Sequence, residues 1–241
     1  MSVASWILPI FEVRDGFRMA FRSLDQLMSR GKMIDVLWLT LSMIVAWFIY
    51  TPIHELLHVA GCRLTGGTVT ELALAPEYGA HLLKKIFPFI HPESNYAGQL
   101  TGFTTPSRLS YFVTDMLPYV LSLFGLPVLH WATQKKWVWL AGLGYLLAFI
   151  PFMSIPGDLY EAVSLYVSPF GELITYPGLE GYLISDDVFL LIKSLQETGQ
   201  WTRSNISLVI IILLGAIYMA CQLLALQVRL LRLMKQDKTS K

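Results

Sequence analysis

Four apolar segments limit what this 241-residue chain can fold into. The hydrocarbon core of a bilayer is about 30 Å thick, and a helix of about 20 apolar residues crosses it. We predict such spans at about residues 34–60, 109–133, 137–157 and 206–230. They should be helical, because a backbone in lipid must satisfy its own hydrogen bonds. Charged residues make up only 15% of the chain, against about a quarter in soluble domains. The sequence therefore predicts an α fold, a polytopic membrane helix bundle that forms one domain over residues 33–233.

The segment before the first span, residues 1–32, has a different pattern. Apolar residues recur at helical spacing: Ile10, Val13, Phe17, Ala20, Phe21, Leu24, Leu27 and Met28. Arg14, Arg18 and Arg22 share another face. This pattern is typical of an amphipathic helix that lies on a membrane surface. A cytosolic helix packed on the bundle would give the same pattern.

The distribution of charge predicts how the bundle is oriented. Loops on the cytoplasmic side of membrane proteins carry an excess of Lys and Arg. Basic residues gather before the first span, in the short second connection and after the last span, whereas the third connection is acidic. We therefore expect both termini in the cytoplasm, with residues 234–241 as a basic tail. The long first connection is the exception, since its Arg63, Lys84, Lys85 and Arg108 would lie outside. A net charge of +1 gives no basic field for nucleic acid, so lipid is the expected surroundings.

Two connections contain predicted elements of their own. In the first, residues 68–75 alternate roughly between polar and apolar side chains until Pro76. This alternation predicts a short strand within a β-hairpin-like insertion. In the third, residues 185–198 read as an amphipathic helix with Ser185 as its cap.

The segment His54-Glu55-Leu56-Leu57-His58 indicates chemistry. Positions i and i+4 share a helix face, so both imidazoles can reach one metal ion. The intervening Glu55 stands next to the first histidine, as the general base does in zinc peptidases. Zinc lowers the pKa of a bound water towards 7, and a carboxylate can take the proton as hydroxide attacks a carbonyl.

The position of this motif strengthens the interpretation. It continues directly from an apolar span, and ionisable groups at membrane depth usually mark function. Histidines that face headgroups at a helix end would not explain the spacing. Cys62 and Cys221 are far apart, so neither a disulfide framework nor a cysteine zinc site is expected.

A catalytic zinc ion normally has three protein ligands and an open position. The candidates for the third ligand are Asp158, Asp115, Glu161, His81 and His91. The first and third spans both run outward, so Asp158, about 21 residues beyond Trp137, lies at the same end as the histidines. Pro156-Gly157 just before it could turn the carboxylate into the bundle.

We favour Asp158 as this ligand, with Asp115 next as a ligand, a supporting partner or a polar contact between helices. Glu161, one turn beyond Asp158, could support the site or be a solvated charge. His81 and His91 are expected in a surface loop. His130 is expected at the opposite end of the second span.

On these residues the chain resembles the site-2 protease family of intramembrane zinc metalloproteases, from the first span to Leu159. In that family the histidine-glutamate motif ends a transmembrane helix, and an aspartate at the end of a later helix completes the site. The resemblance implies His54, His58 and Asp158 as zinc ligands and Glu55 as the catalytic base. Pro151 and Pro156 match the family's proline-containing run loosely, and Leu159 stands where the family usually has glycine. These departures are those of a divergent member.

The resemblance implies hydrolysis of a peptide bond in or near the transmembrane segment of a membrane-anchored protein. The substrate helix must unwind locally, because its peptide bonds are hydrogen-bonded. The strand at residues 68–75 stands where the family has a membrane-associated hairpin, and such a hairpin could bind the unwound segment by strand addition. We expect the active site nearer the outer face.

Other functions are compatible with parts of the pattern. A peptidase could trim peptides at the membrane surface. A catalytically inactive homologue could act as a membrane-helix-binding chaperone or adaptor, although the intact motif argues against it. A transporter would spread its polar groups along several spans.

Overall fold

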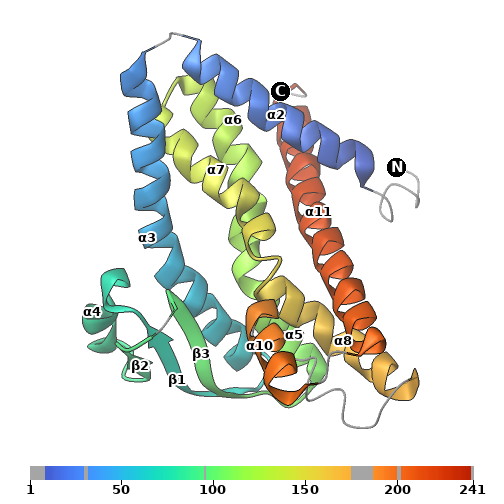
Figure 1. Cartoon of the computed structure of the whole chain (residues 1–241). Coiled ribbons are helices and arrows are strands. Elements are labelled where there is room, and N and C mark those ends of the chain that lie inside the picture. The colour runs from blue at the N-terminus through green and yellow to red at the C-terminus, as the bar shows by residue number, and fades with distance from the viewer. Residues whose placement is uncertain (1–8, 30–31, 95, 175–186, 200–201, 240–241) are drawn as a thin grey trace.

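The computed structural model describes residues 9–29, 32–94, 96–174, 187–199 and 202–239 (Figure 1). Helices dominate, and a small sheet lies at one end of the bundle. Four helical segments are long and apolar enough to cross a membrane: Met33–Leu64, Arg108–Lys135, Val138–Pro169 and Arg203–Gln236. The predicted helix bundle with four candidate spans is thereby confirmed.

The first candidate span is a single helix, α3 (Met33–Leu64). Large apolar side chains remain exposed along it as far as Ile53, as expected for a helix at the edge of a bundle in lipid. From His54 onward the helix is mostly buried, because it packs against α5 (Arg108–Met116), β1 (Thr68–Leu74) and β3 (Gly98–Thr104). The histidine motif thus lies where α3 passes from an exposed to a covered environment.

The insertion after α3 is a three-stranded mixed sheet of order β2-β1-β3. The strand β1 pairs in parallel with β2 (Ile90–His91) and antiparallel with β3. The short helices η1 (Pro76–Tyr78) and α4 (Ala80–Lys84) connect β1 to β2. The predicted strand is present. Its antiparallel partner is the distant strand β3, with Thr68 opposite Thr104 and Leu74 opposite Gly98. Alternation predicts a strand, whereas its pairing depends on distant residues.

The sheet has its own small core against α3. Leu72, Leu74 and Ile90 are buried there with Val59 of α3. His81 and His91 belong to α4 and β2, so the expected loop is wrong, although both side chains are exposed as expected.

The second candidate span is not one continuous α-helix. It consists of α5, the 3₁₀ helix η2 (Leu117–Phe124) and α6 (Gly125–Lys135). The change at Pro118 has a local cause, since proline lacks the N–H that an α-helix requires. Gln227 of the last span accepts a hydrogen bond from the Leu126 backbone N–H at 3.1 Å and donates one to the Ala148 carbonyl at 3.2 Å. This buried amide therefore joins three spans.

The third candidate span has a break at the place where the prediction ends it. The helix α7 (Val138–Met153) is followed by turns at 154–157, and α8 (Asp158–Ile174) then begins. The third span was predicted to end at residue 157, with a connection following it. This boundary is wrong, because the chain continues as helix α8 from Asp158. The next helix, α10 (Val188–Thr198), begins after Asp187, whose side chain accepts a hydrogen bond from the Leu190 N–H. The predicted cap, Ser185, lies outside the described residues.

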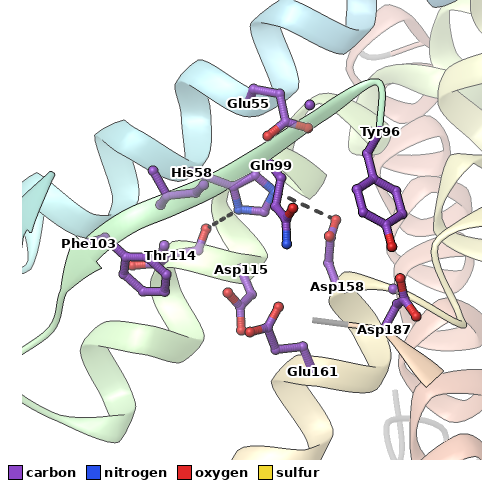
Figure 2. A pocket seen from close by; sticks show the side chains of 13 residues that line it. Glu55, His58, Tyr96, Gln99, Phe103, Thr114, Asp115, Asp158, Glu161 and Asp187 are labelled. Carbon is purple, nitrogen blue, oxygen red and sulfur yellow. Dashed lines mark hydrogen bonds and ion pairs between the residues drawn. The ribbon is translucent and has the colours of Figure 1, made fainter. Parts of the chain in front are cut away.

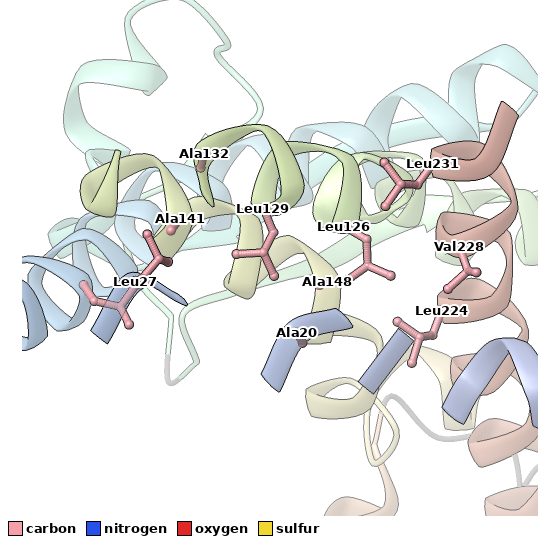
Figure 3. Packing of buried hydrophobic residues seen from close by; sticks show 11 residues of the cluster. Ala20, Leu27, Leu126, Leu129, Ala132, Ala141, Ala148, Leu224, Val228 and Leu231 are labelled. Carbon is pink, nitrogen blue, oxygen red and sulfur yellow. The ribbon is translucent and has the colours of Figure 1, made fainter. Parts of the chain in front are cut away.

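The last span belongs to α11 (Arg203–Thr239), which is longer than predicted. Residues 234–239 continue this helix, so the expected separate tail begins within it. Its residues pack with α2 (Ile10–Met28), α6 and α7 around one core cluster. Figure 3 shows Leu126, Leu129, Leu224, Val228 and Leu231 meeting in this cluster.

The amphipathic helix α2 packs on the bundle against α6 and α11. Gly16 on its packed face allows close approach, since a Cβ atom there would lie 2.9 Å from Leu224 Cγ. Ala20 and Leu27 are buried, but Ile10 and Phe21 remain exposed on the other side. The predicted apolar face is thus divided between the bundle and the surroundings.

Among the described residues, Glu12 and Asp15 of α2 form ion pairs with α11. Glu12 and Arg229 are both buried, with 3.4 Å between Oε1 and Nη2. Asp15 and Arg232 lie closer, 2.7 Å apart, but the Arg232 side chain is 47% exposed. Removing one partner of a buried pair leaves an uncompensated charge, whereas an exposed pair is screened by water.

We expect Glu12→Gln to lower the stability of the protein far more than Asp15→Asn. The buried substitution should cost about 3 kcal/mol, and the more exposed one less than about 1 kcal/mol. Apparent unfolding midpoints in one detergent would compare the two variants. Equal shifts would contradict the assignment of Glu12 and Arg229 as a stabilising buried pair.

Candidate metal centre

The last turns of α3 place two histidines on one face. His54 and His58 are four residues apart, and their Nε2 atoms lie 3.0 Å from each other. Both side chains are buried. The spacing by itself produces this arrangement, because positions i and i+4 of a helix are neighbours.

The third group comes from the break in the third span. Asp158 is the first residue of α8, and its Oδ2 atom lies 3.0 Å from His54 Nε2 and 3.7 Å from His58 Nε2. The Tyr119 hydroxyl of η2 donates a hydrogen bond of 2.8 Å to the same oxygen. Three segments of the chain therefore meet around one point.

Each imidazole is also held through its other nitrogen. His58 Nδ1 lies 2.9 Å from the Thr114 carbonyl oxygen. That carbonyl is available because Pro118, four residues later, has no N–H to donate to it. The Tyr50 hydroxyl lies 2.7 Å from His54 Nδ1, one turn earlier on α3. Such contacts fix ring orientation and tautomer in metal sites.

The donor atoms fit a metal ion. A carbonyl only accepts hydrogen bonds, so His58 Nδ1 carries the proton of that bond and a neutral ring turns the lone pair of Nε2 inward. This lone pair faces His54 Nε2 and the Asp158 carboxylate, so a cation at that point would accept electron pairs from all three groups. The three atoms lie within 4.8 Å of one another.

The spacing can be compared with that of a tetrahedral zinc site. Ligand atoms at about 2.0–2.1 Å from a tetrahedral zinc lie roughly 3.3 Å apart. The observed separations of 3.0, 3.0 and 3.7 Å lie around that value. Two imidazoles and a carboxylate are also the kind of ligand set that leaves a fourth position open in catalytic sites.

A cavity of about 180 Å³ opens beside these residues. Figure 2 shows Glu55, His58 and Asp158 on its wall together with Tyr96 and Gln99. Glu55 is buried and follows His54 directly on α3. Glu55 lines the same cavity as His58 and Asp158, two of the three candidate ligands.

The backbone of β3 passes close to this carboxylate. A Cβ atom at Gly98 would clash with Glu55 Cγ and would lie 2.6 Å from Cδ and 2.9 Å from Oε1. Only glycine leaves room for Glu55 in this position. The first residue of β3 therefore fixes where the glutamate can lie.

Further carboxylates line the cavity wall. Asp115, Glu161 and Asp187 all lie there, and the Tyr111 hydroxyl donates to Glu161. Asp115, the alternative ligand, does not belong to the group of three donor atoms. His130 lies on α6, whose residues pack with α2 and α11 away from this cavity.

Several contributors had little or no sequence signal. Tyr50 could have been found, because it lies one turn before His54 on the same helix face. The Thr114 carbonyl could have been inferred as free from Pro118. By contrast, Tyr119 and Gly98 reach the site only through the packing of η2 and β3 against α3.

Comparison with known proteins adds no family assignment. No protein-family model, curated protein or solved structure matches this chain. Inferences about function therefore depend on the residues of the site.

Proposed function

We propose that this chain is a membrane-embedded zinc metalloendopeptidase. Its substrate would be a membrane-anchored protein, cleaved in or near the transmembrane segment. The observation that best supports this is the convergence of His54, His58 and Asp158 within 4.8 Å, with Glu55 facing the adjoining cavity.

The chain's own groups have distinct parts in this proposal. When bound, Zn²⁺ acts as a Lewis acid that makes water acidic enough to ionise near neutral pH. Glu55 would take a proton from the attacking water and would return it to the leaving amine. Tyr50, Thr114 and Tyr119 keep the three ligand side chains in place.

The sheet offers a way to hold an unwound substrate segment. The strand β1 lies in the middle of the sheet, where β2 pairs with it only at Leu72 and Ala73. Among the described strands, β3 has a neighbour on one side only, and its residues Gly98, Gln99 and Leu100 line the cavity. An extended peptide paired with the outer edge of β3 would run beside Glu55.

Metal content is the direct test of the proposed centre. Protein purified in detergent should contain about one zinc ion per chain, and His54→Ala should lose it. His81→Ala, an exposed histidine of α4, is the matched control and should keep it.

Cleavage is the second part of the test. Reporters with one transmembrane segment, with and without a central proline, would be reconstituted with the protein in vesicles. Cleavage that a zinc chelator stops and added zinc restores would support the peptidase. Folded protein without zinc or cleavage would contradict it and favour the helix-binding chaperone.

Gly98→Ala should slow cleavage without removing the metal. The added methyl group must displace either β3 or Glu55, and misplacement by about 1 Å can cost roughly 100-fold in rate. Thr101→Ala, at an exposed position of the same strand, should have little effect. Unchanged cleavage by Gly98→Ala would show that Glu55 is not held by this contact.

A further inference from the structure

A second cavity lies at the opposite end of the bundle, where α2 crosses α6 and α11 (Figure 1). Its volume is about 310 Å³. Residues of all three helices line it, and the metal centre does not share any of them. This end of the bundle also holds both termini of the described chain.

The lining side chains of this cavity favour an anion. Arg22 and Lys235 carry positive charge, and His130 lines the cavity with them. Hydroxyl and amide groups complete the polar lining, contributed by Ser23, Gln26, Thr133 and Gln134. No carboxylate lines the cavity in the described part of the chain.

The two cations differ from their neighbours in pairing. Arg229 and Arg232, on the same helix as Lys235, pair with Glu12 and Asp15. For Arg22 and Lys235, no ion pair with a described carboxylate is formed. Their charge is therefore available to a ligand.

The rest of the cavity suits a molecule with apolar chains. Leu126, Leu129 and Leu231 form its buried floor and belong to the core cluster in Figure 3. The helices that line the cavity also carry exposed large apolar side chains: Phe21, Trp131 and Met234 are the sequence neighbours of Arg22, His130 and Lys235. A polar cavity next to an exposed apolar surface matches the boundary between headgroups and acyl chains.

We propose that this cavity binds the headgroup of an anionic phospholipid. The phosphate would lie between Arg22 and Lys235, since guanidinium and ammonium groups both bind phosphate oxygens strongly. The acyl chains would follow the exposed apolar side chains. Basic pockets between transmembrane helices are known to hold such headgroups. The lipid would join α2 to α6 and α11, and this role is independent of the proposed peptidase.

Retention of lipid by the intact purified protein tests the proposal. Native mass spectrometry would count phosphatidylglycerol and phosphatidylcholine retained from an equal mixture, and unfolding midpoints would be measured with each lipid. We expect phosphatidylglycerol to be preferred and to raise the midpoint. Each cation near a membrane surface contributes about a fivefold effect, so Arg22→Gln with Lys235→Gln should weaken binding roughly 30-fold.

A variant with the same loss of charge is the control. Arg18→Gln with Lys135→Gln removes two exposed cations that do not line the cavity, and it should keep the preference. Equal retention of both lipids by the wild-type protein would overturn the proposal, as would equal losses in the two double variants. A midpoint shift reproduced by inorganic phosphate alone would identify an anion site and overturn the lipid assignment. If the double variant does not fold, Lys235→Gln alone, at an exposed position, must still weaken retention.

Discussion

Glu55→Gln is expected to stop peptide hydrolysis while the zinc content stays the same. The amide keeps the size of the side chain but cannot accept the proton that a general base must take. Loss of such a base usually costs a factor of about 10² to 10⁴ in rate. His54, His58 and Asp158, which would hold the metal, are unchanged in this variant.

Single-turnover cleavage of a reconstituted reporter, measured beside metal content, tests this expectation. Glu77→Gln, at an exposed position of η1, removes a carboxylate elsewhere and should cleave at the wild-type rate. A Glu55→Gln protein that still cleaves at that rate would remove Glu55 from the mechanism. A variant that loses both zinc and cleavage would instead show that Glu55 supports the site itself.

Asp158→Ala is expected to lose most of the bound zinc. Its Oδ2 atom is the only carboxylate oxygen in the group of three donors found among the described residues. Without Asp158 only two imidazoles remain, whereas catalytic zinc normally has three protein ligands. Asp115→Ala is the matched control, because it removes another buried carboxylate from the same cavity but no donor of that group.

Zinc remaining after dialysis against graded chelator would rank these variants. Tyr119→Phe should fall between wild type and Asp158→Ala, because loss of a group that orients a ligand typically weakens metal affinity about 10- to 100-fold. Zinc retained by Asp158→Ala and lost by Asp115→Ala would transfer the third position to Asp115.

The sequence alone determined the features that depend on neighbouring residues. Apolar length predicted four spans, and helical spacing put His54 and His58 on one face. Both follow from the geometry of a single helix, so no distant contact was needed. Pro118 likewise frees the Thr114 carbonyl by a local rule.

The tertiary structure decided how distant segments meet. Asp158 reaches His54 across 104 positions of sequence. The predicted topology favoured Asp158 only because the first and third spans were expected to end on the same side of the membrane. The spans themselves do not follow simple boundaries, since the third continues through a break at 154–157 and the second changes to 3₁₀ helix.

The same is true of α2 and of the sheet. Periodicity identified α2 as amphipathic, but Glu12 is buried against Arg229, 217 positions away. Alternation identified β1, yet its central place between β2 and β3 depends on pairing register. Local sequence fixes which side chains share a face of a helix or strand. Which faces then meet is decided by burial and by the pairing of polar groups over the whole chain.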